Sequence, residues 1–359
     1  MKINGFFTTH LLEWNNVEND REMPWKSQKD PYKIWLSEVI LQQTRVAQGI
    51  GYYNKFITAF PNVHQLSKAP ETTIFKLWEG LGYYNRCKNL IESAKYISGT
   101  LKGKFPDTYE GILNLKGIGP YTASAIASFA FDLPYAVIDG NVFRVLSRFF
   151  GIHEPIDSTT GKKTFTELAA NLLDNKDPAT YNQAIMDFGA TVCKPKLPLC
   201  SKCYLNTKCV AYQEGYVDLL PIKIKKVNQK IRHFNYLVIK YKDSYLVRKR
   251  STMDIWQNLY EFVLLEFEEP IFRLHITKTA QFKKFFKNSG RFKITDVSEI
   301  YSQKLTHQLI KGQFFEITVS NPIISKTYFP VKKNEIFSLP FPKFITTYLK
   351  DKNVSLNLK

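Results

Sequence analysis

Apolar residues recur at helical spacing through the first half of the chain, and no segment before about residue 230 alternates as a strand would. The pattern is interrupted at Met23-Pro24-Trp25 and resumes after Asp30-Pro31, a capping residue followed by proline at the first helical position. We therefore expect an all-α N-terminal region. The predicted helices cover 5–20, one long helix over 31–56, 65–80, 84–100, a helix beginning at 105–107, 141–150, 161–173 and 181–190.

The pattern changes at residue 231, where strand-like runs begin. Two such runs, joined by Lys242-Asp243-Ser244, predict a β-hairpin. The other elements predicted here are strands over 260–267 and 308–319 and helices over 279–288 and 340–350. The sequence thus predicts an all-α region over 1–212 and a separate α+β domain over 231–350, joined by a polar, basic linker over 213–230.

The chain has 359 residues and a formal net charge of +18, with the basic excess concentrated after residue 212. Such a charge favours a polyanionic partner, although solvated basic faces without any partner are the alternative. No apolar run reaches about 18 residues, and the first residues do not read as a secretory signal. We therefore expect a soluble intracellular protein, cytoplasmic and associated with the nucleoid.

A glycine-rich turn, Lys116-Gly117-Ile118-Gly119-Pro120, opens directly onto a predicted helix. The glycines let the backbone turn tightly, and the N–H groups at a helix start can hold a phosphate. Asp139 follows one helix later, just before another helix begins. This spacing can bring a carboxylate to a nucleic-acid backbone, whereas the simpler interpretation of Asp139 is a helix cap.

Glu38 lies on a largely apolar helix face, with Ile34 and Trp35 one turn before it and Leu41 one turn after it. A glutamate at the edge of a helix usually reaches water. A carboxyl held against apolar neighbours instead has a raised pKa, as a general acid near neutral pH requires. Glu38 is therefore a candidate acid.

Four of the five cysteines form a cluster with the spacing C-x6-C-x2-C-x5-C. They are Cys193, Cys200, Cys203 and Cys209. In an intracellular chain this pattern points to a metal or an iron–sulfur cluster rather than to disulfides. A structural zinc site usually has two close pairs, and only one pair is close here, so the spacing favours a [4Fe-4S] cluster in the loop 193–209.

The hairpin, Asp139 and the cysteine loop together resemble the helix–hairpin–helix DNA glycosylase superfamily, in which the endonuclease III and adenine DNA glycosylase (MutY) families share these features. Three stretches resemble the adenine glycosylases specifically: Pro24-Trp25, DPYKIWLSEVILQQT over 30–44 and WEGLGYY over 78–84. The resemblance covers about residues 5–212. Lyase members carry a lysine where this chain has Tyr121, and tyrosine has no amine with which to form a Schiff base.

The resemblance implies a monofunctional glycosylase of base-excision repair that removes adenine mispaired with 8-oxoguanine or guanine. Adenine must be flipped out of the stack to be reached. Glu38 would protonate a ring nitrogen, and an ionised Asp139 would stabilise the oxocarbenium-like sugar. Tyr121 and Asn141 would orient or shield this pair.

Further DNA contacts are also implied by the resemblance. Trp25 and Asp187 match positions in the adenine pocket. The backbone of Gly117 and Gly119 would hold a phosphate with a monovalent cation. The positions expected at the opposite strand are Gln43, Thr44, Leu81 and Tyr83, and the lysines expected to face phosphates around the cysteine loop are Lys194, Lys196, Lys202 and Lys208.

The C-terminal domain resembles the Nudix-like domain of adenine glycosylases. The family's Phe-Ser-His loop, which reads 8-oxoguanine, corresponds here to Leu305-Thr306-His307, so Thr306 and His307 keep the polar groups while Leu305 replaces the aromatic ring. The chain has no Nudix hydrolase box. The alternative is a basic domain that only raises general DNA affinity.

Two other functions compete with adenine removal: an endonuclease III-like bifunctional glycosylase and abasic-site lyase, and a non-catalytic protein that binds DNA lesions. The presence of both Glu38 and Asp139 argues against a non-catalytic lesion-binding protein. We expect the partner to be double-stranded DNA containing an adenine mispaired with 8-oxoguanine or guanine, bound by a monomer.

Overall fold

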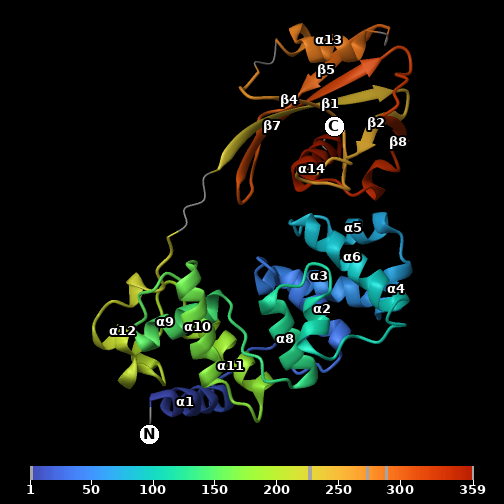
Figure 1. Ribbon diagram of the computed structural model, residues 1–359. Coiled ribbons are helices and arrows are strands. Elements are labelled where there is room, and N and C mark those ends of the chain that lie inside the picture. Colours follow the sequence, from blue (N-terminus) through green and yellow to red (C-terminus); the bar gives the residue numbers. More distant parts are fainter. Residues whose placement is uncertain (1–2, 225–228, 272–274, 288–289, 358–359) are drawn as a thin grey trace. The chain divides into compact units, whose positions relative to one another are not determined.

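The computed structural model describes residues 3–224, 229–271, 275–287 and 290–357 (Figure 1). The chain divides into two compact units, one formed by Met1–Lys68 with Lys88–Lys225 and the other by Ala69–Cys87 with Lys226–Lys359. The sequence pattern did not predict that residues 69–87 pack with the C-terminal part of the chain. Part of the predicted linker, residues 225–228, lies outside the described residues.

The first unit is helical, as predicted from the apolar spacing. The helices up to residue 213, of which α5 belongs to the second unit, are α1 (Ile3–Val17), α2 (Pro31–Leu41), α3 (Val46–Ala59), α4 (Val63–Lys68), α5 (Glu71–Trp78), α6 (Tyr84–Gly99), α7 (Tyr109–Leu113), α8 (Pro120–Phe131), α9 (Gly140–Phe150), α10 (Thr159–Leu172), α11 (Pro178–Thr191) and α12 (Val210–Gln213). Short 3-10 turns follow in the cysteine loop and beyond it, at Cys200–Lys202, Asn206–Lys208 and Val217–Leu219.

Two of the predicted helices are wrong in their extent. The helix predicted over 31–56 is two helices, because α2 ends at Leu41 and Gln43 takes a left-handed conformation with φ 56° before α3 begins. Apolar spacing continues across this turn, so the pattern alone cannot reveal that α3 folds back to pack against α2. The helix predicted over 65–80 is likewise divided, with Pro70 at the N-cap of α5.

Two groups of helices form the first unit (Figure 1). In one, α1, α9, α10 and α11 bury a shared core that includes Phe7, Trp14, Phe149 and Phe188. In the other, α2 packs against α3 and α8. Because nearly every side chain of α2 from Tyr32 to Ile40 is buried, a carboxylate on this helix is forced into an apolar setting. None of the described helices is long and apolar enough to cross a membrane.

The second unit contains a mixed sheet of eight strands within the described residues. The strands are β1 (Lys230–Tyr241), β2 (Ser244–Lys249), β3 (Tyr260–Glu261), β4 (Val263–Phe267), β5 (Phe292–Val297), β6 (Tyr301–Lys304), β7 (Gln308–Val319) and β8 (Phe329–Lys332). The helices are α13 (Ala280–Phe286) and α14 (Lys343–Asn357), besides α5. β1 and β7 lie parallel at the centre, and their register pairs Lys230 with Gln308.

Alternation along the central strands directs side chains to the two faces of the sheet. Leu237 and Phe315 share a core with Phe282 of α13. Phe314, next to Phe315 in sequence, stacks on Tyr348 of α14 with ring centroids 4.0 Å apart. The helices therefore cover opposite faces, as Figure 1 shows.

Sequence predictions for this unit are partly confirmed. The hairpin is present, with Tyr241 opposite Ser244, and β7 covers the predicted range. The strand predicted over 260–267 is interrupted at Phe262. Three strands were missed: β5, β6 and β8 are short and mostly exposed, so they lack the apolar alternation by which a strand is recognised.

Candidate active site

A cavity of about 580 Å³ opens among α2, α8, α9 and α11 of the first unit. It brings together six of the predicted site residues from widely separated segments of the chain. These six are Trp25, Glu38, Thr44, Tyr121, Asp139 and Asn141. Thr44 was predicted at the opposite strand, whereas here it lines the same cavity as both candidate catalytic carboxylates. The volume is in the range that suits a small organic ligand.

Glu38 is buried in the wall of this cavity, with only 6% of its surface exposed. Burial raises the pKa of Glu38 to about 7, and the nearby charge of Asp139 acts in the same direction. The phenol of Tyr121 donates a hydrogen bond to the Glu38 carboxylate, which opposes the rise. The carboxyl can therefore carry a proton near neutral pH, as the sequence predicted from its apolar neighbours.

Asp139 caps the first turn of α9. Its Oδ1 accepts hydrogen bonds from the backbone N–H groups of Asn141 and Val142, both at 2.8 Å, and its Oδ2 accepts one from Asn141 Nδ2 at 2.8 Å. Asn141 is in turn held by Arg144, whose Nη2 donates to Asn141 Oδ1 at 2.7 Å. The capping interpretation and the site interpretation are therefore compatible, because a cap can still line the cavity.

The pKa of Asp139 is also raised, chiefly by burial. The hydrogen bonds from Val142 and Asn141 and the charge of Arg144 oppose that rise. This differs from the expected division into one carboxyl with a raised pKa and one without. The two carboxyls differ in their hydrogen bonds. Three hydrogen bonds favour the ionised form of Asp139, whereas the pKa of Glu38 is lowered only by the hydrogen bond from Tyr121.

Asp187 lies behind the cavity wall rather than on it. Its carboxylate is fully buried and is bound by Arg21 at 2.7 Å and Lys26 at 3.2 Å. Arg21 and Lys26 themselves line the cavity. Asp187 therefore orients two cations that face the cavity instead of contacting a ligand there directly.

The glycine-rich turn connects α7 to α8. Gly117 has φ 79°, and a Cβ at this position would lie 2.6 Å from the side chain of Asn89. Both the backbone conformation and the lack of space therefore favour glycine at this position. Gly119 is the N-cap of α8, and no side chain of the described chain caps this helix end. The first backbone N–H groups of α8 remain suited to an anion. Gly117, Gly119 and Gln43 do not line the cavity.

A second cavity, of about 590 Å³, lies within the second unit. It brings together four more of the predicted contact residues, Leu81, Tyr83, Thr306 and His307. The Tyr83 hydroxyl and Thr306 Oγ1 are hydrogen-bonded at 2.5 Å. The turn 80–86 and the loop 303–308 therefore form one continuous site, although more than two hundred residues separate them in sequence.

The four clustered cysteines line one small cavity, of about 30 Å³, together with Arg148. Arg148 Nη1 donates to Cys193 Sγ at 3.5 Å. Burial and repulsion between neighbouring thiols raise the pKa of Cys203 to about 12 and that of Cys209 to about 11. Within the described ranges, no three His, Cys, Asp or Glu side chains are arranged as a metal site. The four cysteines therefore lie around one cavity, but their side chains are not arranged as metal ligands.

Comparison with known proteins addresses the identity of this site. A profile described as "HhH-GPD superfamily base excision DNA repair protein" matches residues 36–171, which include all four candidate catalytic residues. An adenine DNA glycosylase of Buchnera aphidicola subsp. Schizaphis graminum is 36% identical over 256 residues, covering 71% of this chain and 74% of that protein. The chain belongs to the adenine DNA glycosylase family.

Two further comparisons are consistent with membership of the adenine DNA glycosylase family. The adenine DNA glycosylase of Mus musculus is 41% identical over 60% of this chain and 44% of its own length. The structure of a thermostable thymine-DNA glycosylase is 30% identical, with a TM-score of 0.55 over 59% of this chain and 98% of that chain. This structural match confirms the expected helical glycosylase fold.

Sequence reasoning missed several residues of the cavity in this family member. Gln183 and Met186 of α11 line it, as do Lys26 and Lys29. Gln183 and Met186 are three residues apart and therefore lie on one helix face, a spacing that identifies a shared surface. The two lysines follow Trp25 closely, but nothing in their spacing distinguishes them from other surface lysines.

Proposed function

We propose that this chain is a monofunctional adenine DNA glycosylase that flips adenine out of DNA and hydrolyses its N-glycosidic bond. The observation that carries the proposal is the pair of carboxyls, buried Glu38 and half-buried Asp139, which share one cavity although about a hundred residues separate them. The raised pKa of Glu38, about 7, fits a general acid at neutral pH.

Glu38 supplies the proton in this mechanism. Adenine leaves as an anion only with difficulty, so protonation of a ring nitrogen by Glu38 makes it a better leaving group. Tyr121 donates a hydrogen bond to the Glu38 carboxylate, which supports a fixed direction of proton delivery. Met186 and Trp25 give the cavity apolar surface against which a flipped base can lie.

Asp139 stabilises the sugar as positive charge develops on it. Ionised Asp139 is favoured by its bonds to the N–H groups of α9 and to Asn141, and it retains charge with which to oppose an oxocarbenium ion, electrostatically or covalently. Water then completes hydrolysis. The proton that Glu38 gives to adenine is recovered from this water.

The absence of an amine at Tyr121 supports hydrolysis over lyase chemistry. Two lysines nevertheless line the cavity, Lys26 and Lys29. Lys26 donates to the carbonyl of Arg21 at 2.7 Å and is paired with Asp187, while Lys29 is paired with Asp132 at 2.6 Å. Lys26 is therefore held on a buried carboxylate, whereas the Lys29 pair is exposed and weak. The endonuclease III-like lyase is the second candidate function, and borohydride trapping on abasic DNA distinguishes it from hydrolysis.

The cysteine loop fits a [4Fe-4S] cluster by its donor chemistry. Four cysteines line one cavity, and the buried Arg148 guanidinium offsets negative charge beside Cys193. Cys193, Cys200, Cys203 and Cys209 would hold the cluster, which would fix the loop in place rather than take part in base removal. The lysines of this loop would then face DNA phosphates.

The second cavity is proposed as the site for the base opposite adenine, 8-oxoguanine or guanine. Thr306 and His307 offer polar groups there, and Leu81 and Tyr83 offer surfaces for wedging and stacking. Gln303 also lines this cavity, and its Oε1 is a buried acceptor with no hydrogen-bond partner in the described part of the chain. If the side chain turns toward the cavity, a base N–H can satisfy this acceptor. Residues 231–350 would then be the Nudix-like recognition domain of a monomer acting in the cytoplasm, at the nucleoid.

The proposal is tested by single-turnover adenine release from a duplex in which adenine faces 8-oxoguanine. Glu38→Gln and Asp139→Asn are expected to abolish or strongly slow release. Glu110→Gln, the same chemical change on an exposed residue in the first turn of α7, is the matched control and is expected to leave the rate unchanged. Wild-type rates in both cavity variants would refute the assignment.

A further inference from the structure

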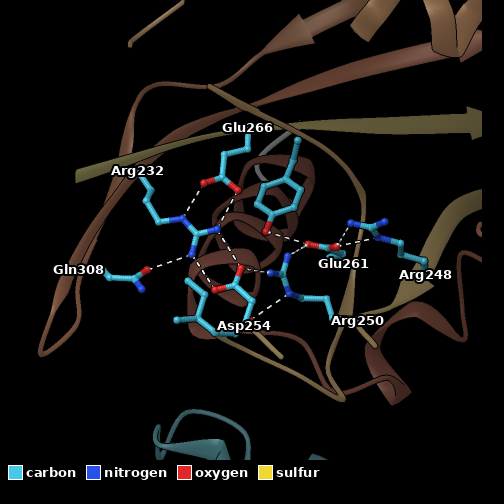
Figure 2. Close-up of polar contacts among 9 residues, drawn as sticks. Arg232, Arg248, Arg250, Asp254, Glu261, Glu266 and Gln308 are labelled. Atoms are coloured by element: carbon cyan, nitrogen blue, oxygen red, sulfur yellow. Dashed lines mark hydrogen bonds and ion pairs between the residues drawn. The ribbon is translucent and has the colours of Figure 1, made fainter. Parts of the chain in front are cut away.

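A chain of alternating charges runs through the second unit from β4 to β2 (Figure 2). Arg232 donates to both oxygens of Glu266, at 2.6 and 2.8 Å, and to both oxygens of Asp254, each at 2.8 Å. Arg250 continues the chain, binding Asp254 at 2.9 Å and Glu261. Arg248 ends it, 2.7 Å from Glu261.

Arg232 connects two walls of the cavity proposed for the opposite base. One wall is the loop 254–257, which Arg232 holds through Asp254. The other is the turn 305–308, which it holds through Gln308, whose Oε1 accepts a hydrogen bond from Arg232 Nη1 at 3.1 Å. A single planar guanidinium is thus shared between segments about fifty residues apart in sequence.

Other hydrogen bonds also attach the turn 305–308 to the start of β1, the strand that carries Arg232. The carbonyl of His307 accepts from the backbone N–H of Lys230 at 2.9 Å, and that of Leu305 accepts from Gln229 Nε2 at 2.9 Å. The side chains of Thr306 and His307 are exposed. Their direction is therefore set by the backbone of the turn, by its attachments to β1 and, for Thr306, by the hydrogen bond to the Tyr83 hydroxyl, rather than by burial.

The loop 254–257 is held in a similar way. The Arg232 guanidinium lies 4.8 Å from the centroid of the Phe234 ring, and Trp256 packs edge-on against the same ring at 5.7 Å. Trp256 has a left-handed φ of 62°, a conformation that a bulky residue keeps only when its surroundings fix it. Arg232 contacts two neighbours of Trp256: the Phe234 ring, on which Trp256 packs, and Asp254, two residues before it.

We infer that Arg232 is a positioning residue for recognition of the base opposite adenine, acting by holding the loop 254–257 and the turn 305–308 in one arrangement. The inference rests on the proposed function. Arg232 does not line the cavity, so it acts through the residues it binds and not by contact with DNA. Its fork geometry is required, because only a guanidinium bonds bidentately to two carboxylates at once.

We expect the chain to fold when Arg232 is replaced. Asp254 retains Arg250, and Glu266 is 40% exposed, so neither carboxylate becomes an isolated buried charge. Arg248 provides the matched control. It is also an arginine of the network, and Glu261 keeps Arg250 and Tyr236 when it is removed, but it binds neither wall of the cavity.

The test uses the full-length chain and measures single-turnover adenine release opposite 8-oxoguanine and opposite guanine. Arg232→Gln is expected to lower the ratio of the two rates by about fivefold or more, with the rate opposite guanine changed less than about twofold. Arg248→Gln is expected to leave the ratio unchanged at a comparable melting temperature. In the double variant with Thr306→Ala, the two losses are expected to be less than additive, because both act on one turn.

The inference is overturned if Arg232→Gln keeps the wild-type ratio, if Arg248→Gln lowers it equally, or if the losses in the double variant are additive. It is also overturned if the wild type releases adenine with no preference between the partner bases, since the turn then reads nothing. Failure of the proposed function is distinct from all of these results, because the wild type would then release no adenine from either duplex.

Discussion

Replacing Glu38 by glutamine tests whether the protein holds this carboxyl in its neutral form. The change keeps the size and removes the titration. In the folded chain the pKa of Glu38 is about 7, against an ordinary value of 4.5. The folded state therefore binds this proton more tightly than the unfolded state does. Its contribution to stability is present in full below about pH 4.5 and is lost as the pH rises through 7.

The size of the effect follows from the difference between the two pKa values. At about 1.4 kcal/mol for each pH unit, the rise from 4.5 to about 7 corresponds to about 3 kcal/mol. Glu38 is 6% exposed, so solvent screens this effect little. Relative to Glu38→Gln, the wild type should lose about 3 kcal/mol of unfolding free energy between pH 4.5 and pH 8.

Urea unfolding of both proteins across this pH range measures the difference, and Glu110→Gln serves as the control, with a curve expected to follow the wild type. The wild-type rate of adenine release should fall over the same interval, as Glu38 loses its proton. Parallel stability curves for wild type and Glu38→Gln would refute the reasoning, because they would mean that Glu38 titrates at its ordinary pKa despite its burial.

Four further outcomes are expected. Tyr121→Phe removes the hydrogen bond that lowers the pKa of Glu38, so the fall of the pH–rate profile should move to higher pH. Asp139→Asn should slow adenine release by about 10²-fold or more with little change in melting temperature, because asparagine also caps a helix well; a large loss of stability would contradict this. Cys203→Ser should remove the visible absorbance of an iron–sulfur cluster and lower the melting temperature, whereas Cys87→Ala, outside the cysteine cavity, should keep the absorbance. Borohydride should trap almost no covalent complex of the wild type on abasic DNA, and efficient trapping would point to Lys26 or Lys29 as a nucleophile.

Much of the first cavity could be predicted from local sequence. Glu38 was recognisable because its apolar neighbours on α2 determine its burial, and Asp139 because a capping residue opens α9. Local pattern is sufficient in these cases because the property of interest is set within one turn of helix.

Other features depend on contacts between distant segments and could not be predicted. Nothing near Asp187 in sequence reveals that Arg21 and Lys26 neutralise it, because those partners lie more than 160 residues away. The raised pKa of Asp139 likewise depends on burial by the assembled cavity. The break between α2 and α3 at Gln43 was not predicted, because the apolar spacing continues through the turn at which α3 folds back onto α2.

The network around Arg232 shows the same limit in the second unit. Arg232, Asp254 and Glu261 are unremarkable charges in the sequence. Strand pairing brings part of the network together, because β1 pairs with β4 near Arg232 and Glu266 and β2 pairs Arg248 with Glu261, while Asp254 comes from a loop. Short exposed strands such as β6, whose loop carries Thr306 and His307, lack alternation and are defined only by pairing with β7.

Identification of the base released in a single turnover tests the central claim most directly. The wild type is incubated in excess with duplexes that present adenine opposite 8-oxoguanine, guanine or cytosine, and thymine opposite guanine, and the free base is identified by chromatography. The account predicts free adenine, released fastest opposite 8-oxoguanine, from a reaction that Glu38→Gln stops. Release of thymine instead, or of no base from any duplex, would contradict it.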